Sequence, residues 1–166
     1  EIGVQTTNPK TMQAIRRAVS FEKLSQVVRR IKAMENIHVH LDLIAGLPFE
    51  DYDSFGRSFD DVYRLEPEQL QLGFLKLLKG SGLRRDAENY EICFRSQAPY
   101  EVLSTHCLSY EDLYRLKLVE EMVETFYNSP KALRAIQFIT TLLPSPFGFF
   151  QALGNFWEEK GYRAVK

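Results

Sequence analysis

Three polar side chains of this 166-residue sequence have the types and positions expected of a small-molecule site. Asp42 precedes Gly46 near the carboxyl end of an expected strand, where its carboxylate can accept hydrogen bonds from a ribose diol. Gln5 ends another expected strand in the same way. Arg17 lies in the helix that follows, and its guanidinium can pair bidentately with a carboxylate. The simpler interpretations are a structural hydrogen bond for Asp42 and a solvated helix face for Arg17.

We expect no metal site. His38, His40 and Asp42 alternate along one segment, but such spacing on a strand supplies two metal ligands at most, and no third ligand is spaced nearby. Cys93 and Cys107 match no CxxC pattern and are too few for a disulfide framework. Their use is typical of a reduced, cytoplasmic setting.

Strands and helices alternate over the first half of the chain. Residues 1–5, 37–48 and 69–75 read as strands, because apolar and polar residues alternate there and turn residues follow. Asn8-Pro9 begins a helix that runs to about Ala18, and Ser20 caps a second that ends near Asn36. Helical spacing predicts one buried stripe in the second helix and one in a third: Leu24, Val27, Val28 and Ile31, then Tyr52, Phe55, Phe59, Val62 and Tyr63.

Side-chain alternation in these strands predicts the fold class. One face of each strand is aliphatic, as in Val39, Leu41 and Leu43, and the other is mostly polar. Strands joined by helical crossovers are parallel, and a parallel sheet covered by helices on both faces would be apolar on both. We therefore expect an α/β fold, a partial (half) TIM-like barrel with parallel strands whose polar lumen holds a ligand near the carboxyl ends of the strands.

The second half of the chain shows only helical patterns. We expect the barrel part to span residues 1–82 and an all-helical C-terminal domain to span residues 83–166. Ser109 caps a helix whose apolar residues share one face, and Asn128-Ser129-Pro130 ends it and begins another. Beyond it, Pro144, Pro146, Gly148 and Gly154 are expected to interrupt any long helix in the aromatic tail.

Composition restricts the partners. The chain has 45% hydrophobic residues and a net charge of -1 from 21 basic and 22 acidic side chains, which is typical of a globular protein. We expect no nucleic-acid or membrane partner, because there is no broad basic surface and no clean apolar stretch long enough to span a bilayer. Since the sequence begins with a strand at Glu1, without a signal peptide, we expect a fragment of a longer protein.

Three segments in order carry a family resemblance. They are EIGVQTTNPKTMQAIRR, HVHLDLIAGLPFED and LQLGFLKLLKGS, and they resemble the second half of the radical S-adenosylmethionine barrel. The branch they resemble most carries an upstream cobalamin-binding domain. The later segments PYEVL, LSYEDLYRL and ETFYNS are similar to the helical domain of unknown function that follows the barrel in that branch.

The resemblance implies an Fe-S oxidoreductase in which S-adenosylmethionine binds beside a [4Fe-4S] cluster and is reductively cleaved to a 5'-deoxyadenosyl radical. By motif position, Gln5 and Asp42 resemble contacts to the ribose or amino-acid part, and Arg17 resembles the partner of the carboxylate. Ile44 resembles the residue that lies against adenine, and Gly46 the loop glycine after it. Leu75 ends the segment 72–75, whose backbone would meet the adenine edge.

The chain departs from the family at the cluster. The CxxxCxxC motif is absent, and Cys93 and Cys107 lie in the wrong region to replace it. Asp42 stands where some members have glycine. We therefore expect the fragment alone to be inactive. The resemblance implies as its partners the missing N-terminal half of its own chain, an unknown small-molecule substrate and, in the cobalamin-binding branch, cobalamin through the upstream domain. An open sheet edge also predicts self-association of the fragment.

Two other functions stay open. The first is a non-catalytic helical module on a degenerate α/β scaffold that binds protein through its aromatic tail, namely Phe147, Phe149, Phe150 and Trp157. The second is a phosphate-binding α/β barrel enzyme that uses the loop Gly80-Ser81-Gly82. The lack of a basic cluster and of a clear helix start after that loop counts against it.

Overall fold

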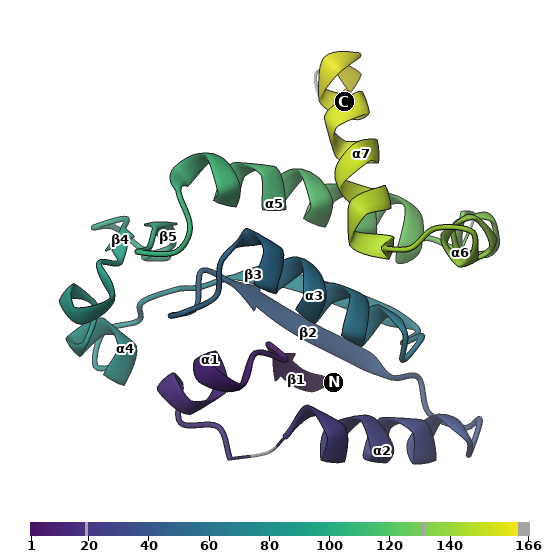
Figure 1. The fold of residues 1–166 in the computed structure, drawn as a ribbon, viewed down its shortest axis with the longest axis horizontal. Helices are drawn as coiled ribbons and strands as arrows, with labels where there is room; N and C mark the ends of the chain where they lie inside the picture. The colour runs from purple at the N-terminus through teal and green to yellow at the C-terminus, as the bar shows by residue number, and fades with distance from the viewer. Residues whose placement is uncertain (19, 131, 163–166) are drawn as a thin grey trace.

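A three-stranded parallel sheet forms the centre of the computed structural model, which describes residues 1–18, 20–130 and 132–162 (Figure 1). The strands are β1 (Ile2–Gln5), β2 (His40–Ala45) and β3 (Gln69–Phe74), in the order β1-β2-β3. Leu41 pairs with Ile2 on one side and with Leu70 on the other. The mixed α/β class and the parallel strands are confirmed. The half TIM-like barrel stays a prediction.

Two of the three helical crossovers begin at the side-chain caps that were expected, Asn8 and Ser20, whereas no cap was named for the third. The crossovers are α1 (Pro9–Ala14), α2 (Phe21–Lys32) and α3 (Tyr52–Tyr63), capped by Asn8, Ser20 and Asp51. Two of these helices, α1 and α2, end several residues earlier in the chain than expected. The first helix stops before Ala18 because Arg16 adopts a left-handed backbone with φ of 58°, and the second ends at Lys32 rather than near Asn36.

The two faces of the sheet have different surroundings. The side chains of Leu41, Leu43 and Leu70 are fully buried, and they belong to one hydrophobic core with Phe55 and Phe59 of α3. The opposite face carries half-buried residues of β2, His40, Asp42 and Ile44. The expected alternation is confirmed for the strands. One position of the α2 stripe was wrong, since half of the Val27 side chain is exposed.

The expectation of an all-helical region after residue 82 was wrong. A short antiparallel pair, β4 (Cys93–Phe94) and β5 (Val102–Ser104), follows α4 (Gly82–Arg85) and the 3-10 turn η1 (Glu88–Tyr90). The amide of Val102 donates to the carbonyl of Leu75, which attaches β5 to the end of β3. Strands this short contain no repeat of apolar positions, so hydrophobic periodicity could not reveal them.

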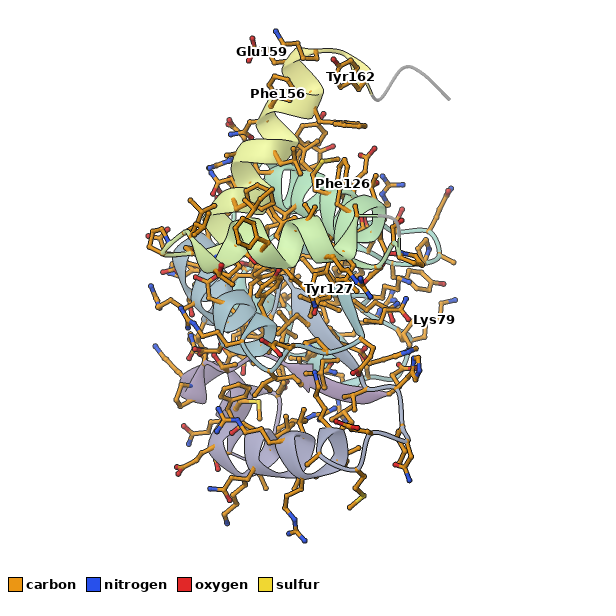
Figure 2. All side chains as sticks on the ribbon, turned by 90° about the vertical axis from the view of Figure 1, so that its right-hand side faces the viewer. Lys79, Phe126, Tyr127, Phe156, Glu159 and Tyr162 are labelled. Atoms are coloured by element: carbon orange, nitrogen blue, oxygen red, sulfur yellow. The ribbon has the colours of Figure 1, made fainter. Side chains whose placement is uncertain are left out.

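A helical layer packs on the sheet and on α3. It consists of α5 (Tyr110–Met122), the π-helix η2 (Val123–Tyr127), α6 (Leu133–Thr141) and α7 (Pro146–Glu159). Figure 2 shows Tyr127 directed toward the sheet, where its hydroxyl donates to the carbonyl of Pro67, and Phe126 beside α7, where its ring meets Trp157. No helix of the described residues is long and apolar enough to cross a membrane.

The aromatic tail forms one unbroken helix, contrary to expectation. Ser145 caps α7 and Pro146 occupies its first turn, where proline is tolerated. Gly154 lies where α7 meets α5, and a Cβ built there would be 3.0 Å from Cβ of Leu118. The glycine therefore permits a close helix crossing rather than a break. Phe147 and Phe150 are buried against Phe59, so these rings belong to the protein's own core.

We predict that Gly154→Val destabilises the chain by about 1 to 3 kcal/mol, because the added carbons overlap Leu118 at the α5–α7 contact. Chemical denaturation measures the loss. Gly148→Ala in the same helix is the control: its added carbon meets nothing closer than 3.5 Å, and alanine favours the helix. Equal stability of the two variants would contradict the close contact.

Candidate functional site

The structure gathers Gln5 and Arg17 around Gly3 on β1. Gln5 has a left-handed backbone with φ of 72°, and the strand register shifts between Gly3 and Gln5. A Cβ at Gly3 would lie 2.3 Å from Nε2 of Gln5 and 3.5 Å from Nη2 of Arg17. Arg17 also donates from Nη1 to the carbonyl of Gly3 at 2.7 Å. Glycine at this position therefore leaves room for the ends of both polar side chains beside the strand.

Asp42 lies next to this group, because Gly3 and Asp42 are partners in the β1–β2 register. Its Oδ1 is buried and has no hydrogen-bond partner among the described residues. Burial, and after it the hydrogen bond and negative charge of the nearby Glu1 carboxyl, raise the pKa of Asp42 to about 6, against the opposing charges of the chain's amino group and His40. A buried acceptor without a donor is costly, so this atom is suited to a ligand that brings a hydroxyl.

An apolar surface adjoins Asp42 along the same face of the sheet. Ile44 is half-buried there, and its register partner on β3 is Gly73. A Cβ at Gly73 would be in ordinary contact with Ile44, 3.8 Å from its Cγ1. Because glycine has no side chain, the sheet surface beside the isoleucine is left uncovered at this position. A flat aromatic ring could lie on it.

Gly46 and Leu75 contact β5 rather than the Gln5 group. Gly46 has φ of 90°, and a Cβ there would be 2.7 Å from Cγ1 of Val102. Leu75 donates its amide to Ala45 and accepts from the amide of Val102, each at 2.9 Å. Both residues thus have structural contacts at the carboxyl ends of β2 and β3, and their role toward a ligand stays a prediction.

A buried polar network joins the ends of β1 and β2. The carboxyl Oε1 of Glu50 accepts hydrogen bonds from the hydroxyls of Thr6 at 2.5 Å and Ser58 at 2.8 Å. Thr11 donates from its hydroxyl to the carbonyl of Pro48, which links the same two loops. Sequence reasoning missed this network. Its signal was a run of polar residues placed directly after each strand, namely Thr6-Thr7 after β1 and Glu50-Asp51 after the β2 loop.

Glu50 is the most perturbed acid of this network. Its side chain is fully buried, and Oε2 has no partner among the described residues. Burial raises the pKa of Glu50 to about 7, although the two hydroxyl donors favour the charged form. The carboxyl therefore changes charge near neutral pH, which makes the joint between the two strand ends sensitive to protonation.

The described residues contain no group of three or more His, Cys, Asp or Glu side chains that could hold a metal ion. Cys93 is a free, exposed thiol and Cys107 is free and half-buried. This part of the chain accordingly does not fit an iron–sulfur cluster.

The comparisons with known proteins each match a part of the chain. Residues 88–166 match a family described as a protein of unknown function, DUF4080. An oxygen-independent coproporphyrinogen III oxidase of Pseudomonas aeruginosa is 32% identical over 71 residues, which are 43% of this chain and 15% of that protein. A protein of the same name from Thermostichus vulcanus is 34% identical over 68 residues, or 41% of this chain and 21% of that protein.

A further relative has no assigned activity. The uncharacterised protein YtqA of Bacillus subtilis is 31% identical over 100 residues, 60% of this chain and 31% of that protein. The chain thus spans between 15% and 31% of the length of these relatives. The chain is thus similar over part of its length to a family of unknown function and to two oxygen-independent coproporphyrinogen III oxidases.

We predict that the free energy of unfolding falls as pH rises from about 5 to 8. The pKa of Glu50 is about 7 in the folded state against 4.5 ordinarily, so folding favours the protonated form, and that stability is lost as pH rises through 7. The loss amounts to roughly 3 kcal/mol at most. Denaturation at several pH values should show that Glu50→Gln flattens this dependence.

The control for Glu50→Gln is Glu22→Gln, which alters an exposed acid in the first turn of α2 and should keep the slope of the unmodified chain. Parallel pH profiles for Glu50→Gln and the unmodified chain would show that Glu50 does not titrate in this range.

Proposed function

We propose that this chain supplies the S-adenosylmethionine-binding side of the barrel in a radical S-adenosylmethionine oxidoreductase. The observation that carries the proposal is the buried, unpartnered Oδ1 of Asp42 next to Gln5 and Arg17. The three segments that resemble the family and the relatives named above support it.

Each residue of the group has a distinct role in this proposal. Asp42 accepts a hydrogen bond from a ribose hydroxyl, and the amide of Gln5 contacts the ribose or the amino-acid part. Arg17 pairs with the carboxylate of the ligand, for which its exposed position is suited. Ile44, beside the uncovered sheet surface at Gly73, packs against adenine. The bound S-adenosylmethionine would supply a one-electron route to the activation of an unreactive C–H bond.

The iron–sulfur cluster belongs to another part of the protein in this proposal, because the described residues do not fit it. A [4Fe-4S] cluster held by cysteines elsewhere in a longer chain would have to meet the ligand at the carboxyl ends of the strands. The chain by itself would then be inactive. Use of cobalamin through an upstream domain is part of the same proposal and rests on the resemblance alone.

We also propose that residues 1–82 form the barrel part and residues 83–166 an accessory part that covers it. Both parts contribute to one hydrophobic core, which runs from Val4 to Phe150. The partners are then the remaining barrel strands and a small-molecule substrate. The rival interaction module has less support, because Phe147 and Phe150 are buried.

We predict that Asp42→Asn and Arg17→Ala each weaken S-adenosylmethionine binding about 10-fold or more, since each removes a charged hydrogen-bonding partner. Isothermal titration calorimetry on the protein that contains this chain measures the affinity. Asp53→Asn and Arg30→Ala, which alter exposed residues on α3 and α2, are the matched controls and should bind normally. Equal affinity in all four variants would refute the site.

We predict that the chain alone self-associates, because no strand pairs with the outer edge of β1 in the described residues. In the described residues β1 is paired only with β2, so its other edge presents free backbone groups, and such edges pair with one another. Light scattering at increasing concentration tests this expectation. A monomer at the highest concentration would show that the edge is protected.

A further inference from the structure

We propose that a basic cavity at the end of α1, lined by the residue that precedes Arg17 in the sequence, binds an acidic group, a carboxylate or a phosphate, of the substrate. Arg16, Lys76 and Arg85 provide the positive charge of this cavity. The inference rests on the proposed function, because it assigns the cavity to the substrate of that same site.

The cavity lies between segments that are distant in sequence. Its volume is about 390 Å³, and it is lined by the end of α1, by residues that follow β3, and by α4. Figure 1 shows α1 and α4 at the same end of the sheet, the end to which the strand arrows point. Parallel-sheet proteins bind ligands at the carboxyl ends of their strands, so the cavity is in the expected place for a substrate.

The charges of the cavity are unbalanced. Arg16, Lys76 and Arg85 face one lining carboxylate, that of Asp86. Among residues 1–18, 20–130 and 132–162, no ion pair joins these three cations to a carboxylate, although Lys32, Arg64 and Lys117 do form such pairs. This excess of positive charge occurs in a chain whose net charge is -1, and an oxyanion would balance it.

The three cationic side chains are exposed, and backbone contacts fix the segments that carry them. Arg16 has its left-handed conformation at the end of α1, where its amide donates to the carbonyl of Gln13. Such a conformation is costly for a residue other than glycine. Lys76 is in a β-bridge with Glu101. The hydroxyl of Ser81 accepts from the amide of Arg84 and thereby caps α4, which carries Arg85.

The remaining lining of the cavity indicates the rest of the substrate. Ile15, Leu78 and Leu83 add apolar surface beside the cations. The next residue after Arg16 is Arg17, which contacts Gly3 in the proposed S-adenosylmethionine site. A small organic acid with an aliphatic part would thus have its charged end at the cations and its carbon chain on the apolar lining of the cavity.

Isothermal titration calorimetry with two probes, glutarate and inorganic phosphate, tests the proposal on the full-length protein. The triple variant Arg16→Gln, Lys76→Gln, Arg85→Gln should bind the preferred probe at least 10-fold more weakly. The control Lys23→Gln, Arg29→Gln, Arg30→Gln removes the same charge from the exposed side of α2 and should bind as the unmodified protein does. The single variants Lys76→Gln and Arg85→Gln should each weaken binding severalfold. They test the proposal even if the triple variant does not fold.

The choice of probe identifies the acid. Tighter binding of glutarate supports a carboxylic acid substrate, and tighter binding of phosphate supports a phosphorylated one. Equal loss in the triple variant and in its control, or no binding of either probe, would overturn the proposal.

Affinity for S-adenosylmethionine, measured in the same samples, separates this proposal from the proposed function. The triple variant should keep that affinity, whereas Asp42→Asn should lose it and still bind the acid probe. If S-adenosylmethionine binds and neither probe does, the acid cavity alone fails. If a probe binds and S-adenosylmethionine does not, the assignment of the cavity to that enzyme's substrate fails.

Discussion

A buried carboxyl group connects the two strand ends on which the candidate site depends. Glu50 follows β2, Thr6 follows β1, and Ser58 of α3 completes the hydrogen bonds to Oε1. Since all three side chains are almost completely buried, the connection excludes water and its geometry is restricted. Gln5 lies directly before Thr6, and Asp42 lies on the strand that leads to Glu50, so this contact adds to the β1–β2 pairing that places the two residues and needs no ligand.

Local signals in the sequence were sufficient for the scaffold. The caps at Asn8, Ser20 and Ser109 act on the next few residues, and the alternation in β2 reports which face is buried, so both can be recognised without the rest of the chain. Features that depend on distant contacts were missed. The pair β4–β5 is attached to the sheet by the hydrogen bond from the amide of Val102 to the carbonyl of Leu75. The glycine of α7 that was expected to break the helix, Gly154, instead allows the close approach of Leu118.

In the candidate site, too, local features could be predicted and features that depend on distant contacts could not. The position of Asp42 on the polar face follows from alternation along one strand. The approach of Gln5 and Arg17 over Gly3 does not, because it depends on a left-handed residue at the strand end and on a chain reversal at Arg16. Likewise, the expected lack of a helix start after Gly80-Ser81-Gly82 was wrong, since α4 begins at Gly82 with two arginines in its only turn. Short helices give no periodic signal.

Two successive arginines therefore illustrate how one backbone conformation can serve two neighbouring sites. The end of α1 at Arg16 directs Arg17 back to β1, where it donates to the carbonyl of Gly3, and leaves Arg16 to line the cavity with Lys76 and Arg85. A helix continued to Ala18 would place the two side chains about 100° apart on one regular surface. The left-handed residue ends that regular surface, so Arg17 can reach β1 while Arg16 lines the cavity for which we propose an acidic ligand.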